Sequence, residues 1–143
     1  MSTPYALDRK TPWHLWVVAI LTLLWNGSGA ITILLAQLGR LPDISADEAA
    51  YYAAQPSWFA ISSIATFAPF AAGIALLVRS RLVVLLFALS LALILANSIY
   101  ELAAGVSRAL ANPGAMVVTI IIVAIAILQL VYANAMNKRG VLR

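Results

Sequence analysis

The chain has 143 residues, of which 64% are apolar and 10% charged, with a mean hydropathy of +0.97. A soluble domain is about a quarter charged and roughly half apolar, so this composition excludes an ordinary water-soluble protein. Lys, Arg, Asp and Glu are absent from four runs, at 11–39, 49–78, 82–100 and 109–137. Because about 20 apolar residues cross the ~30 Å hydrocarbon core, each run predicts one transmembrane helix. The remainder is too short for a separate soluble domain.

Several kinds of membrane chemistry are excluded by the residue types. The chain has no cysteine, which excludes disulfide relays, iron–sulfur clusters and thiolate metal sites. Its single histidine, His14, cannot supply both ligands of a bis-histidine haem within one copy. The sequence also lacks the paired carboxylates that would indicate a hydrolytic site. We therefore expect a protein without a cofactor, a metal site or enzymatic activity.

Charged residues predict the orientation in the membrane. Arg40 and Arg108 share one side with four of the five acidic residues, and the other seven basic residues lie on the opposite side. Those seven are Arg9, Lys10, Arg79, Arg81, Lys138, Arg139 and Arg143. By the positive-inside rule, we expect both termini to be cytoplasmic and the protein to lie in a bacterial inner membrane. This topology accounts for the net charge of +4, so no nucleic-acid partner is expected.

The first helix is expected over 13–36, with Asn26 roughly 20 Å along its axis at 1.5 Å per residue. Trp13, His14 and Trp16 stand where it enters the membrane. Amphipathic rings favour the headgroup region, so we interpret these three residues as interfacial anchors. A ligand role for His14 is the alternative. A cleaved signal peptide is disfavoured, because the apolar residues continue to complete a full span.

A stripe of small residues follows on the same helix. Ser28, Thr32 and Ala36 recur at every fourth position and therefore share one helix face. Small side chains allow the backbone of a neighbouring helix to approach closely. We interpret the stripe as a candidate surface for helix association.

The connection over 37–56 carries most of the outer acidic charge. Ser45 followed by Glu48 is a capping-box pattern, and no helix-breaking residue follows it before Gln55-Pro56. This pattern predicts a short helix over 46–54 on the outer surface, which either connects the spans or caps a pocket. Aromatic residues expected at the interface here are Tyr51, Tyr52 and Trp58.

Three further spans complete the expected all-α bundle. The second, over 57–78, contains Pro69, which frees a backbone carbonyl that must find a partner inside the protein because lipid offers none. The third, over 82–104, follows a tight basic turn. The fourth, over 115–136, follows the turn signal Asn112-Pro113-Gly114.

Polar residues in the outer half of the spans are expected to converge, because unpaired polar groups are costly in the membrane. The candidate ligand pocket comprises Asn26, Ser62, Thr66, Asn97, Tyr100 and Glu101. Asn97 and Glu101 are four residues apart and therefore lie on one helix face. Two alternatives remain. The cluster is either a ligand site or a set of interhelical hydrogen bonds, and Glu101 either takes part in proton-coupled binding or is hydrated at the outer interface beside Arg108.

Several segments carry a family resemblance. They are Pro12-Trp13-His14-Leu15-Trp16-Val17-Val18, Leu23-Leu24-Trp25-Asn26, Pro56-Ser57-Trp58, Leu77-Val78-Arg79-Ser80-Arg81 and Arg139-Gly140-Val141-Leu142-Arg143, together about half of the chain. In these segments the chain resembles a group of small, uncharacterised bacterial four-helix inner-membrane proteins, some of them loosely labelled sugar transporters. The resemblance implies a four-helix bundle whose first outer connection is short, acidic and aromatic.

Two functions are compatible with these features. The first is association without catalysis, as a homodimer, a larger membrane complex or an accessory subunit, through small-residue and lipid-facing surfaces. The alternative is a binder or carrier of a small apolar or sugar-like solute in the outer-facing polar pocket. In both cases the lipid bilayer is the principal partner.

Overall fold

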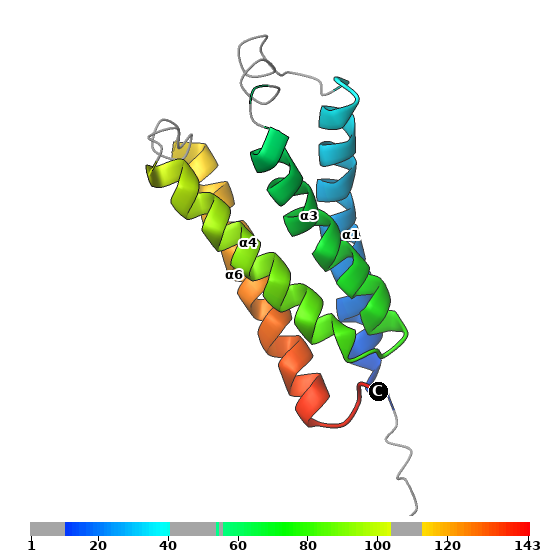
Figure 1. The fold of residues 1–143 in the computed structure, drawn as a ribbon. Helices are drawn as coiled ribbons and strands as arrows, with labels where there is room; N and C mark the ends of the chain where they lie inside the picture. Colours follow the sequence, from blue (N-terminus) through cyan, green and yellow to red (C-terminus); the bar gives the residue numbers. More distant parts are fainter. Residues whose placement is uncertain (1–10, 41–53, 55, 104–112) are drawn as a thin grey trace, which may run out of the picture.

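The computed structural model describes residues 11–40, 54, 56–103 and 113–143. These residues form four long helices, α1 (Trp13–Gln37), α3 (Pro56–Leu77), α4 (Leu82–Ala103) and α6 (Pro113–Lys138) (Figure 1). Each helix is long and apolar enough to cross a bilayer. The expected bundle of four membrane spans is therefore confirmed. The predicted helix over 46–54 lies, except for Ala54, outside the described residues.

The helices pack in chain order, α1 on α3, α3 on α4 and α4 on α6. In Figure 1 the pair α1/α3 separates from the pair α4/α6 toward the end away from the C-terminus. At the other end a continuous hydrophobic core holds the helices together. It comprises Leu15, Ala19, Ala72, Leu76, Val83, Phe87, Ala133, Met136, Val141 and Leu142. We call this the basic end, because Arg79, Arg81, Lys138 and Arg139 lie there.

Small residues allow α1 and α3 to approach closely. A Cβ atom placed on Gly73 would lie 2.8 Å from Cδ2 and 2.9 Å from Cγ of Leu23. A Cβ atom on Gly29 would lie 3.3 Å from Cγ2 of Thr66. Lipid tails are as apolar as leucine, so helix association in a membrane depends on such close van der Waals packing. These two glycines therefore fix the separation of α1 and α3.

Pro69 removes a hydrogen-bond donor from α3, and a side chain of α4 supplies another donor in its place. Proline has no N–H, so the carbonyl of Ala65, four residues earlier, loses its intrahelical donor. The hydroxyl of Ser90 on α4 donates a hydrogen bond of 2.8 Å to that carbonyl oxygen. Ser90 is only 2% exposed. The freed carbonyl thus has the internal partner that a membrane requires.

The last residues of the chain close the basic end. Gly140 (φ 68°) ends α6 in a left-handed conformation, and the Val141 N–H donates to the Met136 carbonyl. The segment then turns under the bundle, where Val141 and Leu142 are buried in the core. Its backbone pairs with the α3–α4 turn, since the Arg143 N–H donates to the Arg79 carbonyl at 2.6 Å.

Arg79 supports this docking with its side chain. Its Nε donates a hydrogen bond of 3.0 Å to the Val141 carbonyl. Arg79 itself has φ 61°, a left-handed conformation that a non-glycine residue adopts at a cost. No expectation from the sequence had placed residues 141–142 in the core.

Candidate functional site

A polar cavity of about 280 Å³ lies between the helices, away from the hydrophobic core. All four helices contribute to its lining, which includes hydroxyl and amide side chains. The described residues that line it are Trp25, Asn26, Gly29, Ser62, Ala65, Thr66, Pro69, Ile94, Asn97, Ser98, Thr119 and Ile122. None of these twelve side chains carries a charge.

On the α1 side, the cavity is formed by Asn26 and the close approach at Gly29. The Asn26 Nδ2 donates a hydrogen bond of 2.9 Å to the Thr22 carbonyl of the same helix. Glycine at position 29 brings the Thr66 methyl group of α3 against the α1 backbone. The cavity wall on this side is therefore fixed by backbone contact and by the amide's bond to its own helix.

On the α3 side, Ser62 and Thr66 stand one helical turn apart. The Thr66 hydroxyl donates to the Ser62 carbonyl at 2.9 Å, which leaves its oxygen able to accept another bond. The Ser62 Oγ is buried and has no hydrogen-bond partner among the described residues. Buried hydroxyl groups are normally paired. The Ser62 hydroxyl is therefore an unpaired polar group, among the described residues, in the wall of the cavity.

The remaining walls come from α4 and α6. Asn97 and Ser98 belong to α4, where the Ser98 hydroxyl donates to the Ile94 carbonyl at 2.9 Å. Thr119 contributes from α6. Ser98 and Thr119 belong to the same pattern of polar residues in the outer half of the spans, but the predicted pocket did not include them.

Four of the six residues predicted for the pocket, Asn26, Ser62, Thr66 and Asn97, line this one cavity. Tyr100 is 52% exposed and is not among the residues that line the cavity. Glu101 belongs to the helical range of α4, but its side chain lies outside the description. Trp25 also lines the cavity. The predicted pocket did not include it, because that prediction was based on polar side chains and the tryptophan ring is largely apolar.

The predicted association stripe lies on the less buried side of α1. Ser28 and Thr32 are exposed, and Ala36 is half-buried. Both hydroxyls donate within α1, Ser28 to the Trp25 carbonyl at 2.7 Å and Thr32 to the Ser28 carbonyl at 3.0 Å. The stripe therefore presents small side chains whose donors are already used.

Of the predicted interfacial anchors, Trp13 and Trp16 are exposed at the start of α1. His14 points to α6, where its Nδ1 and the Tyr132 hydroxyl form a hydrogen bond of 2.7 Å. Tyr51 and Tyr52 lie outside the described residues, and so does the side chain of Trp58. His14 thus joins the first and last helices at the basic end.

Comparison with known proteins gives no match: no protein family, no curated protein and no solved structure is significantly similar to the chain. The chain is therefore classified by its four candidate membrane spans. This is a four-span membrane protein. Across the described residues, no three His, Cys, Asp or Glu side chains gather in a way that would hold a metal ion.

Proposed function

We propose that this four-span membrane protein binds a small, neutral, hydrogen-bonding solute, such as a sugar-like molecule, in the polar cavity. The observation that carries the proposal is the buried Ser62 Oγ, which has no hydrogen-bond partner among the described residues. Other polar side chains that line the same space include Asn26, Thr66 and Asn97, which come from three different helices. A solute with hydroxyl or carbonyl groups would satisfy the Ser62 hydroxyl.

The size and polarity of the cavity support a small occupant. Ligand pockets typically measure roughly 300–1,000 Å³, and this one, at about 280 Å³, is just below that range. Uncharged lining residues on every wall make an ion an unfavourable ligand, because an unpaired charge in the membrane is expensive. The single histidine and the absence of cysteine support binding without catalysis.

Charge distribution supports an orientation in which solute reaches the cavity from the outer side. The turn with Arg79 and Arg81 and the segment with Lys138 and Arg139 lie together at the basic end. The positive-inside rule assigns that end, with both termini, to the cytoplasm of a bacterial inner membrane. The cavity then lies in the half of the bundle away from the cytoplasm.

Single-cysteine labelling tests the proposal directly, because the natural chain contains no cysteine. We expect a small, uncharged, hydrophilic thiol reagent that does not cross the membrane to modify Ser62→Cys and Thr66→Cys from the outer side, since a solute cavity holds water. Ile64→Cys is the matched control on α3, because Ile64 is 51% exposed on the lipid-facing side and a lipid-facing thiol stays unreactive.

Protection from labelling identifies the solute class. A panel of neutral sugars and polyols is added during the labelling of Thr66→Cys, and a true ligand slows the modification in a saturable way. If Thr66→Cys and Ser62→Cys are as unreactive as Ile64→Cys, the cavity is dry. Its polar groups then serve only as contacts between helices, and the proposal is wrong.

A second candidate function is association with another membrane protein through α1. The exposed Ser28 and Thr32, with their hydroxyls bonded within the helix, favour it. We expect Ser28→Leu to break up a complex seen by native mass spectrometry after gentle extraction. Leu34→Phe, an enlargement at another exposed position of α1, is the control that should leave it intact. A monomer in lipid would contradict association.

A further inference from the structure

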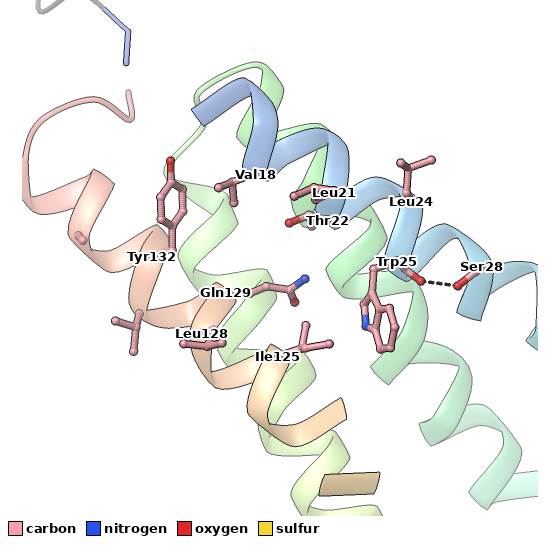
Figure 2. A pocket seen from close by; sticks show the side chains of 12 residues that line it. Val18, Leu21, Thr22, Leu24, Trp25, Ser28, Ile125, Leu128, Gln129 and Tyr132 are labelled. Carbon is pink, nitrogen blue, oxygen red and sulfur yellow. Dashed lines mark hydrogen bonds between the residues drawn. The ribbon is translucent and has the colours of Figure 1, made fainter. Parts of the chain in front are cut away.

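A second hollow of the molecule lies between α1 and α6, which do not pack along their length. It is a groove of about 880 Å³ that is open on one side (Figure 2). The residues that line it include the apolar Leu21, Leu128 and Val131, together with Trp25, Gln129 and Tyr132. At the basic end the bond between His14 and Tyr132 holds the two helices together.

Two polar groups project into this largely apolar groove. Figure 2 shows the Gln129 amide extending from α6 toward α1, and the Trp25 indole standing in the groove from the α1 side. Across the described residues, neither the side-chain amide of Gln129 nor the indole N–H of Trp25 has a hydrogen-bond partner, whereas the Trp25 backbone carbonyl accepts a bond from Ser28. Polar groups that face a membrane interior without a partner are costly, so an occupant that pairs with them is strongly favoured.

Both groups lie near the middle of the membrane. Gln129 precedes Lys138, the last residue of α6, by nine positions, which is roughly 14 Å along the helix. Trp25 follows Trp13, the first residue of α1, by twelve positions, which is roughly 18 Å. The hydrocarbon core is ~30 Å thick. A partner for these groups must therefore place its own polar atoms at the depth of the acyl chains.

This depth excludes the most abundant occupants. Phospholipid esters lie at the polar boundary of the bilayer, so only their acyl chains reach Gln129, and acyl chains cannot form a hydrogen bond. A second copy does not fit either. Gln129 is recessed in its own groove, and the exposed side chains beside it, Leu21, Leu128 and Val131, are apolar.

We propose that the groove between α1 and α6 binds a membrane-soluble lipophilic compound with hydrogen-bond-accepting carbonyl groups, such as a quinone-like ring. The amide of Gln129 and the indole N–H of Trp25 donate to its carbonyl oxygens, and the apolar lining holds its hydrocarbon part. A volume of about 880 Å³ is within the roughly 300–1,000 Å³ of ligand pockets. This site is independent of the proposed solute cavity, although Trp25 lines both.

Tryptophan fluorescence of the protein in phosphatidylcholine nanodiscs tests the site, with decyl-benzoquinone as the probe. We expect saturable quenching that is largely lost in Trp25→Phe. Gln129→Met keeps the length of the side chain but removes the amide, and we expect about a fivefold weaker apparent affinity, the usual effect of one hydrogen bond. Asn134→Met is the matched control, because Asn134 is an exposed amide on α6 outside the groove.

Competition separates hydrogen bonding from simple partition into lipid. Decylbenzene has a ring and a chain but no carbonyl groups, and we expect it not to displace the quinone. Unchanged thermal unfolding of Gln129→Met shows that the variant is folded, and native mass spectrometry reports bound probe independently of fluorescence. Quenching that rises linearly without saturation, or equal affinities of Gln129→Met and Asn134→Met, would overturn the proposal. Cysteine cross-linking of two copies at Leu128→Cys that depends on Gln129 would also overturn it.

Discussion

Replacing Ser90 by alanine tests whether α4 repairs the break that proline makes in α3. In the natural chain the substitution removes the bond of 2.8 Å and leaves the Ala65 carbonyl buried without a donor. Leaving a buried polar group unpaired costs about 1–3 kcal/mol. In a Pro69→Ala background, the amide at position 69 donates to the Ala65 carbonyl within the helix. Ser90→Ala then costs on the order of 0.6 kcal/mol, the average for side-chain bonds between membrane helices.

The measurement is a double-mutant cycle of Ser90→Ala and Pro69→Ala. Free energies of unfolding come from reversible unfolding of the four proteins in mixed micelles with a rising fraction of a denaturing detergent, followed by circular dichroism. The expected coupling free energy is about 1 kcal/mol. Ser98→Ala is the control on the same helix, since its hydroxyl bonds within α4. Equal costs of Ser90→Ala in the two backgrounds would refute the reasoning.

Two further substitutions test the packing. Gly73→Ala places a methyl group 2.8 Å from the Leu23 side chain and should cost about 1–3 kcal/mol, whereas Gly27→Ala meets its nearest atom at 3.5 Å and should cost nothing. Both substitutions replace a helical glycine by alanine, so any difference between them reports on packing. Equal free energies of unfolding of the two variants would contradict the packing argument. Leu142→Ala should destabilise the protein by about 2–5 kcal/mol in the same assay. Leu85→Ala, at an exposed position of α4, should have far less effect, and similar losses would show that the terminal segment is not part of the core.

The four spans were predictable because charged residues bound each apolar run, and the cost of burying charge in lipid makes that signal strong. Pro69 also predicted that a carbonyl would need a partner, but not that Ser90 would provide it. Sequence alone does not fix the rotation of α4 against α3. The docked terminal segment was missed, although Gly140 followed by two apolar residues is a typical helix ending with a hydrophobic contact.

The groove could not be predicted from hydropathy. In a membrane, side chains that face lipid and side chains that face a groove are equally apolar. The sequence therefore does not distinguish Leu24 and Leu128, which line the groove, from residues that face lipid. Gln129 is polar at mid-depth, but only the separation of α1 from α6 shows that its amide faces an open space rather than a neighbouring helix.

The asymmetry between the two ends of the bundle favours binding over rapid transport by a single copy. Release of a solute at the basic end would require the buried Val141 and Leu142 to leave the core. Exposing two such side chains costs about 3–6 kcal/mol, before the loss of the Arg79 and His14 hydrogen bonds. Since each 1.4 kcal/mol is a tenfold change in population, the open form would be rarer than about one molecule in a hundred. A carrier built on this chain would therefore need a partner that lowers the cost of undocking the terminal segment.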